Sequence, residues 1–350
     1  MNARYRTLIA ITFVLIVALV IVVLPTMAQS GTDCPTCPVS FNTPSILDPN
    51  SNAAIETATL FYVVLGIATF IFVLVEGLLI ISVFRFRNRP ASEALQIHGN
   101  TKLEIAWTAI PALILAVLLG FTLRSMANIR APISGEAIKV KVIGHQWWWE
   151  FEYPDLKITT ANQLVVPTGK RIDVELVTVD VQHGFWVPQL FGKMDAVAGH
   201  TNRLNFSVNN VGEYGGQCTQ LCGEQHAQMR FSVIALSSAD FQKWAVAQQQ
   251  PAPSPTTDAA TLGQKTFIEK CSACHTIVGT SAVGKVGPNL THVASRDFIA
   301  GGILKRSDDN LKLWIQNAQA IKPASKMQNF EGQLDSQTIG NIVAYLATLK

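Results

Sequence analysis

The chain is 350 residues long, which is enough for two or three separately folded units. Apolar residues make up 49% of it and charged residues only 15%, a composition that favours attachment to a membrane. The net charge of +3 is too small to indicate nucleic-acid binding. The six cysteines form three close pairs, which suit cofactor sites at least as well as a disulfide scaffold.

The chain begins with a basic stretch, followed by the apolar run 8–24 and a small-residue cleavage pattern that ends at Ala28. Residues 1–28 are therefore predicted to be a signal peptide, although the apolar run is long enough to stay as an anchor. Cys34 and Cys37 follow in the sequence DCPTCP. Outside the cytoplasm this pair favours a disulfide or two thiols near a chain end, with a metal site as the alternative.

Two further apolar segments, 60–84 and 105–123, are each long enough to cross a bilayer of about 30 Å at about 1.5 Å per residue. They predict a two-helix transmembrane hairpin over residues 55–125. The connection between them is basic, from Arg85 to Lys102, which places it in the cytoplasm by the positive-inside rule. We therefore expect the soluble domains that follow to lie on the extracytoplasmic face.

The sequence changes character after the hairpin. Residues 130–245 contain short runs such as AIKVKVIG and RIDVELVTV, bounded by Gly, Pro, Asn or Asp, and this spacing predicts an all-β sandwich. A linker rich in Pro, Gln and Ala covers 246–260. Residues 261–350 have mainly helical periodicity. The predicted fold is multidomain: a transmembrane helical hairpin, an all-β sandwich and a small all-α domain.

The sequence QCTQLCGEQHAQM brings Cys218, Cys222, His226 and Met229 within twelve residues. Two neighbouring cysteines outside the cytoplasm suggest a disulfide when taken alone. Imidazole, thiolate and thioether together form a soft ligand set that suits copper instead, and two thiolates on one loop suggest sulfurs that bridge two copper ions. A second histidine is then required, and His183 in the sequence QHGFWVP can supply it.

The pattern C-x-x-x-C-G-x-x-H-x-x-M, preceded by H-x-x-W-V-P, resembles subunit II of the haem-copper cytochrome c oxidases over most of residues 55–245. The segments GHQWWWEFEYP and LEIAWTAIPA add to this resemblance. It implies a cupredoxin-like β domain with a dinuclear copper A centre. The implied copper ligands are His183, Cys218, the backbone carbonyl of Gln220, Cys222, His226 and Met229.

Gln220 departs from the pattern of that family. Most members have a glutamate between the two cysteines, and its carboxylate helps to bind magnesium at the interface with the catalytic subunit. Gln220 has an amide oxygen but no charge, so the magnesium site is in doubt while copper binding is not.

The resemblance also implies roles for Trp147 and Glu104. Electrons from the donor would enter the copper centre at Trp147, whereas Trp148 and Trp149 are assigned to packing. Glu104 lies three residues before Trp107 in LEIAWT, where the family has the entrance of a proton channel. The alternative for Glu104 is a carboxylate that stabilises the start of a helix, and both interpretations stay open.

The sequence CSACH is the C-x-x-C-H attachment motif of c-type haem. Cys271 and Cys274 would bind the haem covalently, with His275 as one axial iron ligand. Electron-transfer haems commonly use methionine as the other axial ligand, and Met327 is the only methionine downstream of the motif. Together with VGPNL and the final helix, these residues give 258–350 a resemblance to class I cytochrome c.

The complete pattern resembles a subunit II with a fused cytochrome c domain, as in caa-type oxidases of bacterial cell membranes. The resemblance implies that electrons pass from haem c to copper A and on to subunit I, where oxygen reduction is coupled to proton translocation. The expected partners are subunit I, other membrane subunits and, where the fused cytochrome accepts electrons from another protein, an external electron donor.

Three alternative functions remain at this stage. A quinol oxidase subunit II shares the fold but lacks copper, which the retained ligands disfavour. A nitric oxide reductase-type complex would pair a copper A subunit with a different catalytic partner. A membrane-anchored binding module stabilised by disulfides would have no redox role.

Overall fold

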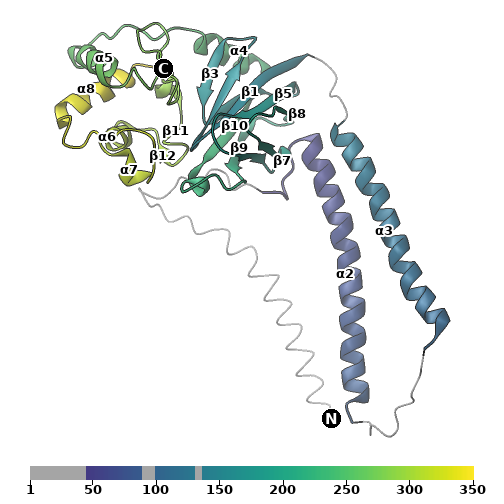
Figure 1. The fold of residues 1–350 in the computed structure, drawn as a ribbon. Helices are drawn as coiled ribbons and strands as arrows, with labels where there is room; N and C mark the ends of the chain where they lie inside the picture. Colours follow the sequence, from purple (N-terminus) through teal and green to yellow (C-terminus); the bar gives the residue numbers. More distant parts are fainter. Residues whose placement is uncertain (1–44, 89–98, 131–135) are drawn as a thin grey trace. The chain divides into compact units, whose positions relative to one another are not determined.

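The structure, a computed structural model, describes residues 45–88, 99–130 and 136–350 (Figure 1). The signal peptide predicted over 1–28 and the first cysteine pair lie outside the described residues. Everything that is described falls within one compact unit.

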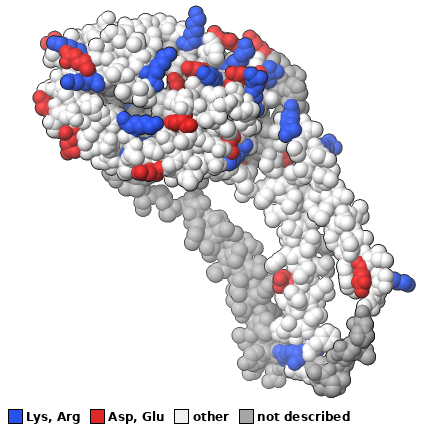
Figure 2. All heavy atoms as spheres, in the orientation of Figure 1, with Lys and Arg blue, Asp and Glu red and all other residues white. Residues whose placement is uncertain are grey.

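Two long apolar helices, α2 (Asn52–Phe86) and α3 (Thr101–Arg130), form the predicted hairpin. Their most apolar windows have mean hydropathies of 2.7 and 2.1, so both helices are long and apolar enough to cross a membrane. On the face shown in Figure 2, charged side chains gather on the soluble part and near the helix ends, and are sparse between those ends. Lipid on the outer surface of this hairpin would cover side chains that the chain alone leaves exposed.

The start of α2 is fixed to the β domain by backbone and side-chain hydrogen bonds. Ser51 caps the helix, since its hydroxyl accepts a hydrogen bond from the Ala54 amide at 3.0 Å. The same hydroxyl donates to the carbonyl of Leu190, and the Asn50 amide donates to the carbonyl of Gln189 at 2.7 Å. The membrane anchor and the soluble sandwich are therefore joined where the chain enters α2.

The β domain is a sandwich of two five-stranded sheets. Sheet A has the spatial order β3-β2-β1-β5-β8, and sheet B has the order β4-β10-β9-β6-β7. In chain order the elements are β1 (Ala137–His145), β2 (Trp148–Tyr153), β3 (Ile158–Ala161), β4 (Gln163–Pro167), β5 (Arg171–Thr178), β6 (His183–Val187), β7 (Phe191–Ala196), β8 (Asn202–Phe206), β9 (Gly212–Cys218), the short 3₁₀ helix η2 (His226–Gln228) and β10 (Arg230–Leu236). The predicted all-β sandwich is confirmed, with both parallel and antiparallel strand pairs.

Aromatic side chains form the centre of the sandwich. Along β2 every second residue is buried, so Trp149, Phe151 and Tyr153 all point inward from sheet A. From sheet B, the rings of Phe185 and Phe231 stack with centroids 4.6 Å apart, and Trp149 meets Phe231 edge-to-face at 5.6 Å. These contacts hold the two sheets together directly below the loops that carry the metal-ligand candidates.

A short connection leads from the β domain to the helical domain. Helix α4 (Ser238–Gln248) packs on the sandwich, and residues 249–257 contain no helix or strand. This stretch is shorter than the predicted linker 246–260. At its start, α4 includes residues 246–248. At its end, α5 begins at Asp258, where the Thr257 side chain caps the helix by accepting a hydrogen bond from the Ala260 amide. The elements that follow are α5 (Asp258–Lys270), η3 (Val293–Ser295), β11 (Phe298–Ile299), β12 (Leu304–Lys305), α6 (Asp308–Gln316), α7 (Ala318–Ile321) and α8 (Ser336–Leu346).

Helices α5 and α8 cross at a glycine. A Cβ atom on Gly263 would lie 1.9 Å from the backbone oxygen of Asn341, so only glycine allows the two helices to approach this closely. One turn further along α5, Phe267 meets Tyr345 edge-to-face at a centroid distance of 6.0 Å. The crossing therefore fixes the positions of α5 and α8, and both helices line a cavity in the helical domain that is described below.

Replacing Gly263 with alanine should separate α5 from α8 and destabilise the helical domain by about 1–3 kcal/mol or more, because backbone atoms cannot move aside as a side chain can. Hydrogen exchange of α5 and α8 in the full chain measures this effect. Gly340→Ala on α8 is the matched control, since no atom lies within 4 Å of its added Cβ. Equal exchange in the two variants would contradict the proposed role of the crossing.

Candidate functional site

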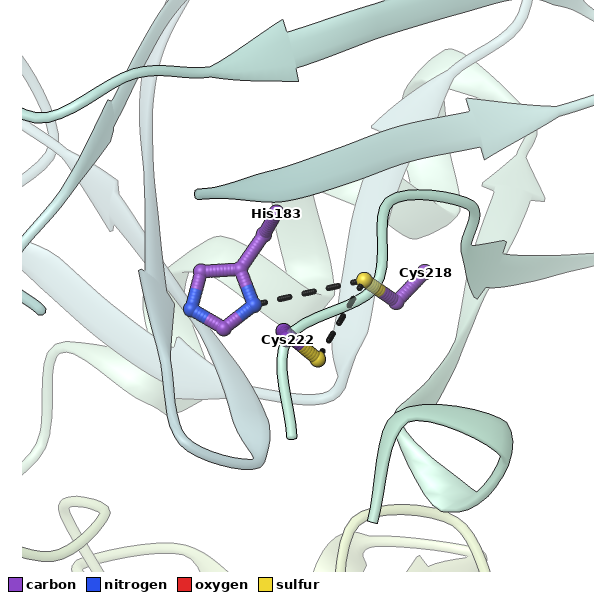
Figure 3. A group of neighbouring side chains, drawn as sticks. All are labelled: His183, Cys218 and Cys222. Atoms are coloured by element: carbon purple, nitrogen blue, oxygen red, sulfur yellow. Dashed lines mark hydrogen bonds between the residues drawn. The ribbon is translucent and has the colours of Figure 1, made fainter. Parts of the chain in front are cut away.

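Two buried sulfur atoms lie at the centre of the first site (Figure 3). Cys218 is the last residue of β9 and Cys222 lies in the loop that follows, with their Sγ atoms 3.8 Å apart. His183 begins the neighbouring strand β6, and its Nδ1 atom lies 4.0 Å from the Cys218 sulfur. The ligand atoms of these three buried residues all lie within 4.8 Å of one another. The pairing of β6 with β9 thus brings together residues that are 35 positions apart.

The remaining predicted ligands close the same cluster. His226 Nδ1 and Met229 Sδ lie 3.7 Å and 3.9 Å from the Cys222 sulfur. The backbone oxygen of Gln220 lies 3.3 Å from the Cys218 sulfur. The one-turn helix η2 lets His226 and Met229 both face the cysteines, and the β9–β10 pairing holds its far end. All six predicted positions therefore converge in one place.

The two thiols have opposite pKa shifts. A hydrogen bond from the Cys222 thiol lowers the pKa of Cys218, although burial opposes this, and His183 and the Gly184 amide add to the lowering. The resulting Cys218 thiolate, together with burial, raises the pKa of Cys222. Two thiolates this close need positive charge between or beside them, which bound metal cations supply.

Asp180 orients His183 and was not among the residues found from the sequence. Its carboxylate lies 2.9 Å from Nε2 of His183, which leaves Nδ1 facing the Cys218 sulfur. Burial opposes ionisation of Asp180, but hydrogen bonds from His183 and from the amides of Gln146 and Val181 lower its pKa overall. The spacing D-x-x-H immediately before β6 was the signal in the sequence that could have indicated it.

The donor set has the composition that dinuclear copper requires. Two cysteine sulfurs, two imidazole nitrogens and a thioether are soft or intermediate ligands, and one carbonyl oxygen, a hard ligand, lies beside them. The residues present therefore fit a soft metal such as copper better than a hard cation such as magnesium, and the two cysteines with His183, His226 and Met229 would hold it.

Trp147 is buried beside this cluster. Its indole Nε1 donates to the carbonyl of Cys222 at 3.0 Å, and only 8% of the residue is exposed. Trp148 instead stacks on His145 at a centroid distance of 4.1 Å, and Trp149 lies in the core. The three adjacent tryptophans thus differ, and only Trp147 makes contact with the backbone of a metal-ligand candidate.

The second site is a cavity of about 320 Å³ with mainly apolar walls. Cys271, Cys274, His275 and Met327 all line it, which brings together the four residues expected to hold haem c. Trp147 lines the same cavity from the β domain. Two thiols that can attach a haem, two side chains that can bind its iron and a mainly apolar lining together fit a c-type haem.

The ring of His275 is fixed in one tautomer. Its Nδ1 lies 2.8 Å from the carbonyl of Pro288, which can only accept, so Nδ1 carries the proton and Nε2 is left for iron. A Cβ atom on Gly287 would lie 2.5 Å from the His275 ring, so this glycine leaves space for the imidazole. Burial lowers the pKa of His275, which favours the neutral form that a metal ligand needs.

Glu104 forms reciprocal hydrogen bonds at the start of α3. Its carboxylate accepts from the Asn100 amide at 3.2 Å, while the Asn100 side chain accepts from the Leu103 amide at 3.2 Å. This is the arrangement of a helix cap and gives Glu104 a structural role. The proton-channel role remains a prediction.

Comparison with known proteins gives three family matches along the chain. Residues 41–124 match the transmembrane domain of cytochrome c oxidase subunit II, 156–236 match its periplasmic domain, and 260–350 match cytochrome c.

Curated relatives cover most of the chain. It is 34% identical to cytochrome c oxidase subunit 2 of Alkalihalophilus pseudofirmus over 79% of this chain and 82% of the relative. It is 37% identical to the protein of the same name from Bacillus sp. PS3, over 76% of this chain and 80% of the relative. Among solved structures, the periplasmic domain of subunit II of cytochrome oxidase (CoxB) of Bradyrhizobium japonicum is 30% identical, with a TM-score of 0.32, over 33% of this chain and 97% of that one.

Gly184→Ala should weaken copper binding on the order of 10–100-fold, as loss of a group that supports metal ligands typically does. The added Cβ would lie 2.8 Å from the Gln220 amide and 2.9 Å from the backbone of Thr219, so the cysteine loop would have to move. Copper titration of the full chain, followed by its optical spectrum, measures the loss. Gly192→Ala on β7 is the control, with no atom within 4 Å of its Cβ. Unchanged copper affinity in Gly184→Ala would contradict the tight loop packing.

Proposed function

Because the chain belongs to the cytochrome c oxidase subunit II family, we propose that its two clusters are the copper A and haem c sites of one electron path. The chain is the subunit at which electrons enter a bacterial haem-copper oxidase. It is anchored in the membrane, with its periplasmic domain on the extracytoplasmic side. The family matches imply copper A in the β domain and haem c in the helical domain.

In this proposal, each residue of the two clusters has a defined task. His183, Cys218, Cys222, His226 and Met229 hold the copper ions through side chains, and Gln220 through its backbone oxygen. Cys271 and Cys274 attach the haem, while His275 and Met327 are its axial ligands. When bound, these groups accept and release single electrons. The protein contributes a rigid ligand geometry and a low-dielectric surrounding, so little rearrangement accompanies each transfer.

The observation that carries this proposal is the position of Trp147. Its side chain lines the haem cavity and also donates a hydrogen bond to the carbonyl of Cys222. One residue therefore touches both the proposed haem site and a proposed copper ligand. We assign to Trp147 the point at which electrons enter the copper centre, here from the chain's own haem domain.

The remaining assignments concern the rest of the complex. We propose that subunit I, with other membrane subunits, receives the electrons and reduces oxygen, coupled to proton translocation, and that an external donor protein reduces haem c. Glu104 would mark a proton-channel entrance toward subunit I. At Gln220 the amide oxygen accepts from Lys193 Nζ at 3.1 Å, so an uncharged group beside a cation makes this chain a poor magnesium ligand.

We further propose a domain division at 55–125 for the hairpin, 130–245 for the copper domain and 261–350 for the cytochrome c domain; of the predicted linker 246–260, only residues 249–257 lie outside helices. Neither a quinol oxidase subunit nor a nitric oxide reductase-type subunit is favoured, since the copper ligands are complete and the relatives over most of the chain are named cytochrome c oxidase. A redox-silent disulfide module is also disfavoured, because Cys218 and Cys222 are free thiols that face other metal ligands.

Spectroscopy of the full chain tests the function. We expect protein purified in detergent, from cells that attach haem and supplied with copper, to contain one c-type haem and two copper ions. Its electron paramagnetic resonance signal should show one unpaired electron shared by both coppers. A single blue copper centre, or a chain that binds no copper, would contradict the proposal.

Met229→Leu should alter the copper spectrum and its reduction potential while leaving the haem spectrum unchanged. Leucine has a similar volume, so packing should cost less than about 1.5 kcal/mol, but it has no sulfur ligand. Met194→Leu is the control, since Met194 packs against the same core and is not one of the proposed ligands. Identical copper spectra in the two variants would exclude Met229 as a ligand.

A further inference from the structure

One lysine of the cytochrome c domain is buried. Lys322 follows α7 and is only 4% exposed, and it is the one lysine or arginine among the described residues that falls in the buried class. Burial lowers the pKa of its amine to about 7. Placing an amine here therefore costs the fold free energy, which its contacts must offset.

The contacts of Lys322 are three backbone carbonyl oxygens from both domains. Its Nζ donates to Trp147 at 2.8 Å and Gln228 at 3.1 Å in the copper domain, and to Ala300 at 3.4 Å in its own domain. An ammonium group has three N–H donors, so the number of acceptors matches the number of donors. Lys322 thus links the two domains through their backbones.

Both acceptors in the copper domain belong to segments that carry the proposed electron path. Trp147 lines the haem cavity and donates to the carbonyl of Cys222, as its neighbour Gln146 also does. Gln228 lies directly between the proposed ligands His226 and Met229. Loss of the hydrogen bonds from Lys322 would therefore allow the haem domain to move relative to both segments.

The surrounding backbone is packed closely enough to make this position restrictive. A Cβ atom on Gly301 would lie 2.6 Å from Lys322 Nζ and 3.0 Å from the oxygen of Trp147. The Arg230 amide also donates to the oxygen of Gly301 at 3.3 Å. Gly301 has a φ of +73°, which favours glycine, and the absence of a side chain lets its backbone approach the backbone of Trp147 and Arg230 in the copper domain.

Some of the other contacts between the domains are exposed, whereas His292 is buried and its Nε2 lies 3.1 Å from the carbonyl oxygen of Gln248. Lys326 lies 3.6 Å from Asp180, but its side chain is 56% exposed, and exposed pairs of this kind contribute only about 0–1 kcal/mol. Gln163 donates to Asp297 at 2.8 Å. The buried triple contact of Lys322 is therefore the strongest candidate for fixing the geometry of the interface.

We propose that Lys322 is a positioning residue for electron transfer within the chain, holding the cytochrome c domain against the segments that carry Trp147 and Gln228. This inference rests on the proposed function. In each event one electron leaves haem c, which is oxidised, and enters the copper pair, which is reduced, with no bond made or broken. The lysine donates its hydrogen bonds to the carbonyls of Trp147, Gln228 and Ala300, none of which is a proposed copper ligand.

Flash photolysis of the full chain, loaded with haem c and copper, tests this role. A photoexcited flavin supplies less than one electron per molecule, and the subsequent oxidation of haem c by copper is followed optically. Lys322→Met should slow this intramolecular step on the order of 10–100-fold, since small misplacements of reacting groups can have effects of that size. Lys265→Met, at an exposed position on α5, should leave the rate unchanged.

Two further measurements separate positioning from misfolding or a role in the haem pocket. Hydrogen exchange at Arg230, whose amide donates to the carbonyl of Gly301, should speed up in Lys322→Met while the haem content and the copper spectrum stay as in the wild type. Gly301→Ala keeps the lysine but crowds the interface, and should slow the same electron transfer.

A rate within twofold of the wild type in Lys322→Met would overturn the inference. So would a shifted haem potential with unchanged exchange at Arg230, because Lys322 would then act on the haem and not on docking. Failure of the proposed function is recognised separately, since the wild-type chain would then lack the dinuclear copper signal before any variant is compared.

Discussion

The closeness of two buried sulfur atoms is the constraint on which the copper domain depends. Cys218 and Cys222 hold their sulfurs 3.8 Å apart, where one thiolate makes a second one costly. Without metal, the Cys222 thiol donates to the Cys218 thiolate, whereas a cation that both sulfurs share would allow both to be thiolates. A second thiolate, which is costly in the metal-free loop, would thus become favourable in a metal site, and the other ligand candidates are arranged around this pair.

The rest of the sandwich keeps that loop in place. His183 starts a strand whose partner ends at Cys218, so one register fixes ligands from distant parts of the chain. Beneath them, Trp149 packs edge-to-face against His183 at 5.8 Å and against the stacked phenylalanines of sheet B. Close-packed aromatic rings resist small displacements, so the ligands should keep the same positions in both oxidation states of the metal. Rigidity of this kind suits an electron-transfer site, because ligands that do not move when an electron arrives or leaves do not slow the transfer.

The features that could be predicted from the sequence depend on residues that lie close together along the chain. Cys218, Cys222, His226 and Met229 fall on one short loop, and C-x-x-C-H is contiguous, so spacing alone indicated both sites. His183 required the resemblance to a family, because strand pairing and not spacing brings it to the cysteines. Asp180 and Lys322 were missed, since a carboxylate beside a histidine and a lysine in a polar segment are common, and only tertiary contacts distinguish them. The hairpin and the sandwich followed from hydropathy and alternation, which depend on residues close in sequence.

The covalent connection explains how a small set of contacts between domains can be sufficient. The nine residues 249–257 that join α4 to α5 can span at most about 30 Å when extended, so the haem domain stays near the copper domain even when it is not docked. A short tether corresponds to an effective concentration of roughly millimolar, and an interface that would be weak between separate proteins is then largely occupied. Affinity is therefore supplied by the chain itself, and the interface residues are left to determine orientation. A buried lysine that bonds three carbonyls suits that task, because such a contact is lost when the domains shift by a small distance.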